Sequence, residues 1–171
     1  LTALVDDFDG SREEKANRHL SRNQLEVARD RLLMASFLQF TLPGSPSIYY
    51  ADEAGMEGYK DPFNRRTYPW GREDAELLDW YRTLGACRRQ QTALAEGSFT
   101  PLPSGEELVA YTRGEGAGAV LCAVNRAETE HTLLLPPAWA DSRVLCGVGT
   151  CRERVLYLPP LSGVWLGKTM Q

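Results

Sequence analysis

The chain has 171 residues, of which 43% are hydrophobic and 25% are charged, and its formal net charge is −4 at pH 7. These values are ordinary for a soluble globular protein and allow one large or two small domains. The weak acidic balance argues against nucleic acid and anionic membrane surfaces as partners, and no apolar run approaches the roughly 20 residues of a membrane span.

The first 22 residues are mostly polar and charged, which predicts a surface loop. Its three aspartates, Asp6, Asp7 and Asp9, could be read as a calcium site, but an EF-hand loop needs more oxygen ligands at fixed spacing. A solvated loop is therefore the favoured interpretation. The chain starts at Leu1 without a Met or a basic signal region, so we expect it to be cut from a longer protein.

A helix is predicted from about Asn23 to Phe40, with Ser21 or Asn23 as its N-cap. Its second half is apolar almost all round, which indicates burial on more than one side. The Leu42-Pro43-Gly44 sequence then stops the helix, because Gly accepts the left-handed C-cap and Pro cannot continue it.

The next segment, Ser47–Ala51, is short, aromatic and β-branched, and it predicts a strand buried on both faces. About twenty residues of Gly, Pro, charged and aromatic types follow before the next helix. A loop of that length is uncommon unless it is functional or disordered, and its aromatic content argues against disorder.

The sequence from Thr41 to Gly58, TLPGSPSIYYADEAGMEG, followed by KDPFNRRTYPW, resembles the end of the catalytic barrel in the α-amylase superfamily of glycoside hydrolases. The most similar branch is the group of neopullulanases, cyclomaltodextrinases and maltogenic amylases. The resemblance covers residues 1–100 well and the remainder loosely. Two residues depart from the usual pattern: Ala51 stands in place of a Gly, and Tyr59 stands in a usually Gly-rich turn.

After the loop, Glu73 to about Leu94 predicts a second helix, with acidic residues in its first turn and arginines in its last. From Gly97 onward, alternating apolar residues and turn signals predict a small antiparallel sandwich of six strands. The predicted strands are Glu107–Arg113, Ala119–Asn125, His131–Leu135, Arg143–Gly147, Val155–Leu158 and Ser162–Gly167.

The predicted fold class is therefore α+β. Residues 1–96 are expected to be the last helix–strand–helix portion of a (β/α)8 barrel, as the resemblance implies. Residues 97–171 are expected to form an all-β C-terminal domain.

Glycoside hydrolysis needs two carboxyl groups that flank one bond. The resemblance implies a retaining mechanism, with a nucleophilic Asp, an acid Glu and a third Asp that all precede the matched region and have no counterpart here. Asp52 and Glu53 are adjacent, and neighbouring residues of a strand point to opposite faces, so structural anchoring is favoured for them. We expect no catalytic residue in this chain, and hence no activity of the chain alone.

Asp61 and Arg65 are the predicted substrate-binding residues, since the resemblance places the matching Asp and Arg against sugar hydroxyls. A carboxylate accepts hydrogen bonds from such hydroxyls and a guanidinium donates them. The alternative is a salt bridge that only holds the loop, and one pair could do both. For the loop aromatics Tyr59, Phe63 and Trp70, stacking on sugars competes with packing as a small core of the loop.

The four cysteines match no zinc spacing, and neither a metal nor another cofactor is expected. They are interpreted as reduced thiols of a cytoplasmic protein, with a Cys146–Cys151 disulfide as the open alternative. The expected partners are an α-glucan oligosaccharide, the preceding part of the same protein and a second copy in a homodimer. A non-catalytic carbohydrate-binding or interaction module is the rival function, and it would require exposed aromatics on the sandwich, where the candidates are Tyr111, Trp139, Tyr157 and Trp165.

Overall fold

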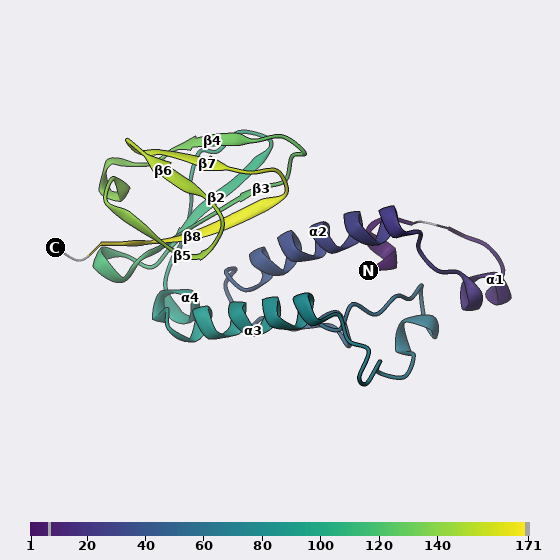
Figure 1. The fold of residues 1–171 in the computed structure, drawn as a ribbon. Helices are drawn as coiled ribbons and strands as arrows, with labels where there is room; N and C mark the ends of the chain where they lie inside the picture. Colours follow the sequence, from purple (N-terminus) through teal and green to yellow (C-terminus); the bar gives the residue numbers. More distant parts are fainter. Residues whose placement is uncertain (7, 170–171) are drawn as a thin grey trace. The chain divides into compact units, whose positions relative to one another are not determined.

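The computed structural model describes residues 1–6 and 8–169, and it has helices in its first half and antiparallel sheets in its second (Figure 1). Two compact units divide the chain: Leu1–Ala35 with Ser47–Arg82, and Ser36–Pro46 with Thr83–Gln171. Both long helices contribute residues to both units. The predicted domain boundary at residues 96 and 97 differs from this division and stays a prediction.

The three longest helices begin at residues whose side chains cap them, whereas α4 has no side-chain cap. Ser11 and Glu14 form a capping box at α1, and Ser21 and Gln24 exchange the same pair of hydrogen bonds at the start of α2. Asp74 caps α3 by accepting from two backbone N–H groups. The helices and 3-10 turns are η1 (Thr2–Leu4), α1 (Arg12–Asn17), α2 (Arg22–Gln39), η2 (Phe63–Arg65), α3 (Ala75–Arg89), α4 (Thr92–Glu96), η3 (Gly116–Gly118) and η4 (Pro137–Trp139).

Two helix predictions need correction. The N-terminal segment contains the short helix α1 where only a loop was predicted, since Ser11 supplies a capping box that hydrophobic periodicity does not reveal. The predicted helix from Glu73 to Leu94 is divided into α3 and α4 by an extended residue, Gln91. Leu94 of α4 is completely buried, so this turn belongs to the core of the second unit.

The predicted strand Ser47–Ala51 was wrong. No strand forms there, and Ile48, Tyr49 and Tyr50 are 43%, 52% and 46% exposed. A strand requires a ladder of hydrogen bonds to a neighbouring strand, and every ladder in the described part of the chain joins strands after residue 98. The residue types of this segment therefore favour a strand, but no neighbouring strand is present among the described residues to hydrogen-bond with it.

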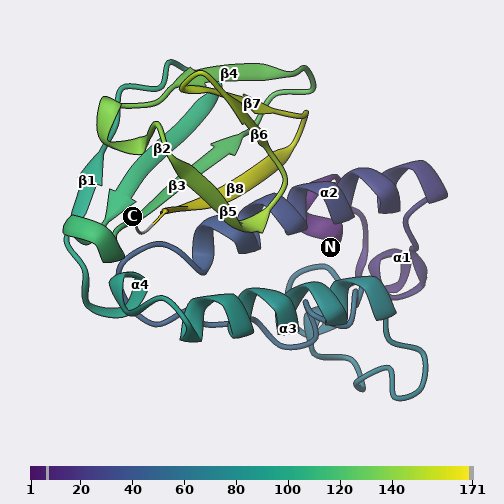
Figure 2. The same cartoon turned by 60° about the vertical axis from the view of Figure 1, so that its left-hand side comes forward.

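The second unit contains two antiparallel sheets, in the orders β1-β2-β3-β8-β5 and β4-β7-β6, and Figure 2 shows β1 at one edge of the larger sheet. All six predicted strands form, with ends within one residue of the prediction. The two additional strands, β1 and β6, have three residues each, too few for a clear alternation. The strands are β1 (Phe99–Pro101), β2 (Leu108–Arg113), β3 (Val120–Asn125), β4 (His131–Leu134), β5 (Ser142–Gly147), β6 (Thr150–Arg152), β7 (Val155–Leu158) and β8 (Ser162–Lys168).

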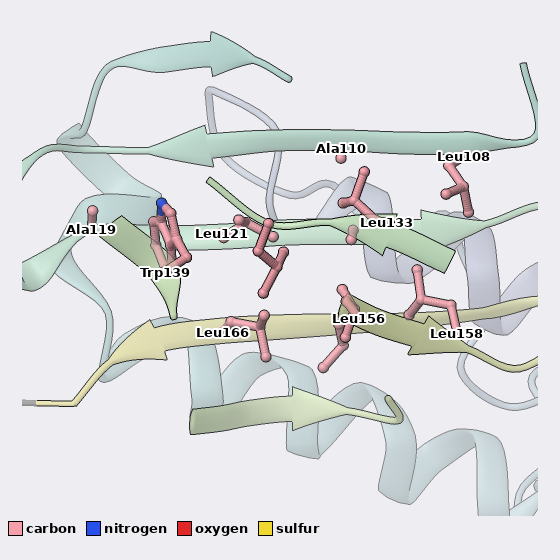
Figure 3. Close-up of a cluster of buried hydrophobic side chains, with 12 residues drawn as sticks. Leu108, Ala110, Ala119, Leu121, Leu133, Trp139, Leu156, Leu158 and Leu166 are labelled. Carbon is pink, nitrogen blue, oxygen red and sulfur yellow. The ribbon is translucent and has the colours of Figure 1, made fainter. Parts of the chain in front are cut away.

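A cluster of aliphatic side chains and Trp139 fills the space between the two sheets (Figure 3). Leu121 and Leu166 enter it from the larger sheet, and Leu156 and Leu158 from the smaller one; all four are completely buried. Burying a leucine side chain contributes roughly 1.5–3 kcal/mol, so this cluster is the main source of stability for the sandwich.

The larger sheet is also covered on its other face, because every residue of β3 is buried. Phe37, in the last turn of α2, packs on Trp165 of β8 with ring centroids 5.1 Å apart. A Cβ atom at Gly147 or Gly163 would come within 3 Å of the Phe37 ring, so only glycine leaves room for it. The end of α2 therefore belongs to the sandwich unit.

Two arginines bind the carbonyl groups that follow α2. Arg88 donates to the carbonyls of Phe40 (2.5 Å) and Gly44 (2.7 Å), and the buried Arg113 donates to the carbonyl of Thr41 (2.5 Å). Burial, followed by the charge of Arg113, lowers the pKa of Arg88. These donors satisfy carbonyls at the C-terminus of a helix, where cations are favoured.

Candidate functional site

The loop between α2 and α3 holds both predicted binding residues and lies in the first unit from Ser47 onward. It turns at Ala51, which has a positive φ of 63°, and the 3-10 turn η2 follows further along the loop. Asp61 precedes η2 and Arg65 ends it, so one turn brings the two side chains together.

Asp61 and Arg65 form an ion pair at the surface. Arg65 Nε donates to Asp61 Oδ1 at 2.6 Å, Nη2 lies 2.5 Å from the same oxygen, and the two side chains are 58% and 68% exposed for Asp61 and Arg65. This carboxylate raises the pKa of Arg65. The salt bridge is thus present, and both polar groups remain accessible to a ligand.

A cavity of about 610 Å³ lies in the same unit, and neither Asp61 nor Arg65 is among its lining residues. It is lined by residues of the loop and of the N-terminal segment, including the loop residues Lys60 and Asn64 on either side of Asp61. Asn64 donates a hydrogen bond to Tyr49 Oη at 2.9 Å within this lining. The aromatic residues of the lining are Phe8, Tyr49, Tyr50 and Tyr59, and the charged ones are Asp6, Asp9, Lys15 and Lys60.

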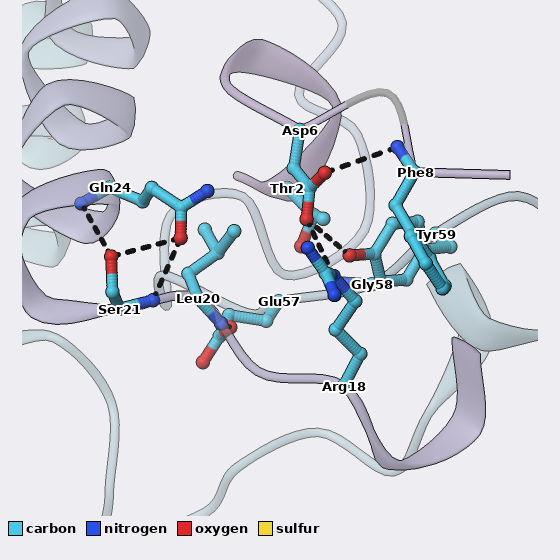
Figure 4. A network of polar contacts seen from close by, with 10 residues as sticks. All are labelled: Thr2, Asp6, Phe8, Arg18, Leu20, Ser21, Gln24, Glu57, Gly58 and Tyr59. Atoms are coloured by element: carbon cyan, nitrogen blue, oxygen red, sulfur yellow. Dashed lines mark hydrogen bonds and ion pairs between the residues drawn. The ribbon is translucent and has the colours of Figure 1, made fainter. Parts of the chain in front are cut away.

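The loop is tied to the N-terminal segment by a network of polar contacts (Figure 4). Tyr59 Oη donates to Asp6 Oδ2 at 2.6 Å, and Arg18 Nε donates to the same oxygen at 2.9 Å. The Arg18 guanidinium also lies 4.1 Å from the centroid of the Phe8 ring, a cation–π contact. These donors lower the pKa of Asp6, with Tyr59 the largest contributor and Arg18 the next.

Neighbouring positions of the loop add further ties. The backbone N–H of Gly58 donates to Thr2 Oγ1 at 3.0 Å, and the backbone N–H of Leu20 donates to Glu57 Oε2 at 2.7 Å. Sequence reasoning missed this network, because the segment around Asp6 was interpreted as a solvated loop. Only the unusual Tyr59 pointed to it, as a departure from a Gly-rich turn.

Asp52 and Glu53 occupy a turn and not the end of a strand, so strand alternation does not describe them. The backbone N–H of Asp52 donates to the carbonyl of Tyr49 at 3.1 Å, which closes this turn. Burial raises the pKa of Asp52. The anchoring role of the Asp52 side chain stays a prediction, since this contact belongs to the backbone.

The loop aromatics form their own contacts. Tyr68 lies 4.6 Å from Trp70 and 6.1 Å from Tyr50, measured between ring centroids, and Tyr59 meets Phe8 edge-on at 6.2 Å. Trp70 is nevertheless 77% exposed. Tyr50, Tyr68 and Trp70 thus contact one another within the loop, while Tyr59 packs on the N-terminal segment. Trp70 presents a face to solvent, and the choice between sugar stacking and loop packing stays a prediction.

The remaining sequence features are placed as follows. All four cysteines are free thiols, and Cys122 and Cys146 are buried. Within the described ranges 1–6 and 8–169, no cluster of three or more His, Cys, Asp or Glu residues is arranged to hold a metal ion, and Asp7 lies outside them. Over the same ranges, no helix combines the length and apolar character needed to cross a membrane.

The two-sheet sandwich and the loop motif resemble the C-terminal region of α-amylase-family glycoside hydrolases, and similarity to known proteins confirms this resemblance. The amylopullulanase of Thermoanaerobacter thermohydrosulfuricus is 43% identical over 88 residues, which are 52% of this chain and 6% of that protein. A cyclomaltodextrinase from a Bacillus species is 32% identical over 114 residues, 64% of this chain and 20% of its own length. No family model matches the chain.

Solved structures extend the similarity over more of the chain. The debranching enzyme of Nostoc punctiforme is similar with a TM-score of 0.73 and 28% identity, over 82% of this chain and 31% of that one. The cyclic α-maltosyl-(1→6)-maltose hydrolase of Arthrobacter globiformis gives a TM-score of 0.67 and 28% identity, over 85% and 31%. The chain spans only 6% to 9% of the first three curated relatives.

Proposed function

We propose that this chain is the C-terminal part of a retaining glycoside hydrolase that acts on α-glucans. The observation that carries the proposal is the structural similarity to a debranching enzyme over 82% of this chain, together with sequence similarity to an amylopullulanase over 52% of it. Residues 1–96 are then the last part of a (β/α)8 barrel and residues 97–171 its C-terminal β-domain. In that protein, the exposed Ser47–Tyr50 segment pairs with strands of the preceding part.

Asp61 and Arg65 are the proposed sugar contacts. Their support is physical: both side chains are exposed, and they offer an acceptor and several donors to vicinal hydroxyls. Lys60 and Asn64, which flank Asp61 in the sequence, line a cavity rich in tyrosine. An exposed ion pair contributes only about 0–1 kcal/mol to stability, so rearranging it around a ligand costs little. Free thiols support a reducing, cytoplasmic location as part of the same proposal.

The rival function, a carbohydrate-binding module, lacks an aromatic platform on the sandwich. Tyr111, Trp139 and Trp165 are 2%, 4% and 0% exposed, which leaves the half-buried Tyr157 alone. Binding isotherms of the chain with maltooligosaccharides test this point, since a module predicts that Tyr157→Ala weakens binding and Arg65→Ala does not.

Kinetics of the parent enzyme test the proposed contacts. Arg65→Ala should lower kcat/KM by a few-fold to a hundred-fold, about 1–3 kcal/mol, through loss of hydrogen bonds to a charged group. Arg72→Ala, an exposed arginine of the same loop, is the matched control. Unchanged kinetics for Arg65→Ala on short and long substrates would assign the pair to loop structure alone.

Hydrolysis assays on the chain alone test its assignment as a part of the enzyme. It should release no reducing sugar from maltooligosaccharides or cyclodextrin, because no positioned pair of carboxyl groups is expected in it. Turnover that persists through purification and disappears in Asp52→Ala or Glu53→Ala would overturn this assignment.

A further inference from the structure

Tyr59 contacts the N-terminal segment directly before the exposed loop residues 60–62, which include Asp61. Its hydroxyl donates to Asp6, whose side chain is only 9% exposed and which also accepts from the backbone N–H of Phe8 at 3.1 Å. Since Arg18 donates to the same carboxylate, Asp6 is a fixed acceptor held by three separate donors. A hydrogen bond to such an ionised acceptor is stronger than one between neutral groups.

A second tie lies just beyond η2. Arg66 Nη2 donates to the backbone carbonyl of Ala16 at 2.8 Å, again in the N-terminal segment. Residues 60–65 are therefore bracketed by two side chains that contact the N-terminal segment, Tyr59 before them and Arg66 after them. Inside this bracket, the backbone contacts Phe63 to Lys60 and Arg65 to Pro62 are local to the segment.

Asp61 and Arg65 lie between these two contacts, in residues 60–65. Their mutual ion pair fixes the distance between them, but it is exposed and does not fix where the pair lies relative to the cavity. Tyr59 also lines the cavity. Its contact with Asp6 therefore holds in place both this part of the cavity lining and the beginning of residues 60–65. The Asp6 carboxylate stays ionised at neutral pH, since its pKa lies below the ordinary value of 3.8.

We propose that Tyr59 is a positioning residue, which through its hydrogen bond to Asp6 places Asp61 and Arg65 for contact with the glucan. This inference rests on the proposed function and adds a residue that does not itself need to touch the sugar. Tyr59→Phe removes the hydroxyl alone and keeps the ring against Phe8. It should weaken maltotriose binding by the full chain about three- to tenfold, less than the roughly ten- to hundredfold of a direct hydrogen bond to a charged group, because Tyr59 acts on the sugar through Asp61 and Arg65.

The experiment uses NMR of the full chain with maltotriose as the ligand and compares Tyr59→Phe, Asp6→Ala and the double variant. If the two residues act as one contact, each single variant and the double variant weaken binding equally. Amide hydrogen exchange of residues 60–65 should rise in all three. In a chain with ¹³C-labelled tyrosine, the Tyr59 Cζ resonance should shift in Asp6→Ala, and Tyr157→Phe is the control for loss of a hydroxyl elsewhere.

Asp61→Ala separates this inference from the proposed function. Suppose that wild type binds maltotriose and that Asp61→Ala weakens this binding. If Tyr59→Phe then matches wild type in affinity and in amide exchange, the positioning role is wrong and the sugar contacts stand. If wild type does not bind, or Asp61→Ala binds as tightly as wild type, the proposed contacts fail and the positioning role fails with them. Additive losses in the double variant would also overturn the single-contact mechanism.

Discussion

At the scale of single residues, two buried hydroxyl groups of the sandwich unit are hydrogen-bonded to each other. Tyr111 Oη and Thr41 Oγ1 are 2.5 Å apart, and Thr41 Oγ1 also lies 3.0 Å from the carbonyl of Leu38. Both residues are almost completely buried. Because a buried hydroxyl without a partner loses its hydration with no compensation, this contact contributes to stability through the cost of breaking it.

Tyr111→Phe should therefore destabilise the chain by about 1–2 kcal/mol in urea unfolding, since it leaves the Thr41 hydroxyl with one partner fewer. Tyr157→Phe, at a half-buried position of β7, is the control and should change stability by less than about 0.5 kcal/mol. Equal effects of the two substitutions would contradict a specific role for the Tyr111–Thr41 contact.

At the scale of helices and strands, capping side chains determine where a helix begins. Asp74 accepts from the backbone N–H groups of Glu76 and Leu77, both at 3.1 Å, and its other oxygen lies 3.1 Å from Arg29 Nε of α2. One side chain thus begins α3 and contacts α2. The capping role of Asp74 and its ion pair with Arg29 can be separated by two substitutions.

Asp74→Ala should destabilise the chain by about 1–2 kcal/mol, because it removes the cap and one partner of Arg29. Asp74→Asn keeps an oxygen that can cap the helix and loses only the charge, so less than half of that loss is expected. Urea unfolding followed by helical circular dichroism measures both. If Asn is as harmful as Ala, the ion pair and not the cap carries the effect.

Strand β3 contains the buried thiol of Cys122, whose ionisation makes the free energy of unfolding depend on pH in the alkaline range. Burial raises the pKa of Cys122 from 9.0 to about 12. Between these values the unfolded chain loses the proton and the folded chain keeps it, so stability is complete below pH 9 and falls as pH rises towards 12. The limiting slope is about 1.4 kcal/mol per pH unit for this group.

Cys122→Ala should flatten the fall in unfolding free energy between pH 9 and 11, with the remaining slope coming from other raised groups such as Cys146 and Tyr111. Val124→Ala, also buried in β3, should lower stability at every pH and leave the slope unchanged. Parallel profiles for wild type and Cys122→Ala would show that this thiol is not the linked group.

At the scale of the whole molecule, we expect the exposed Ser47–Tyr50 segment to govern association. Three consecutive large side chains, Ile48, Tyr49 and Tyr50, are each more than 40% exposed. Antiparallel pairing with the same segment of a second copy places Ile48 opposite Tyr50 in a two-fold arrangement, and such β-branched–aromatic pairs are favourable. Exposed strand-like segments readily template this kind of pairing.

We therefore expect the isolated chain to self-associate at micromolar concentration in size exclusion coupled to light scattering. Ile48→Lys and Tyr50→Lys should restore a monomer, because charges on an edge oppose pairing. Leu134→Lys, at a position of β4 that is 69% exposed, is the matched control and should leave association unchanged. A stable wild-type monomer with cooperative unfolding would refute the expected dimer.

The sequence by itself was sufficient for features that depend on local order. Periodicity and caps predicted α2, alternation with turn signals predicted six strands, and the TLPG and DPFNRR motifs indicated the similarity to glycoside hydrolases. It also named Asp61 and Arg65, whose four-residue spacing allowed the ion pair that η2 forms. Each of these features depends on residues that are near each other in the chain.

Only the tertiary structure decided the features that depend on distant residues. Whether Ser47–Ala51 forms a strand depends on a neighbouring ladder, and burial of β3 on both faces depends on Phe37 and its contact with Gly163. The contact between Asp6 and Tyr59 joins residues 53 positions apart, and neither spacing nor composition indicates it. Hydrogen bonds and packing across such separations leave no periodic trace in the sequence, because they are selected by the fold and not by local geometry.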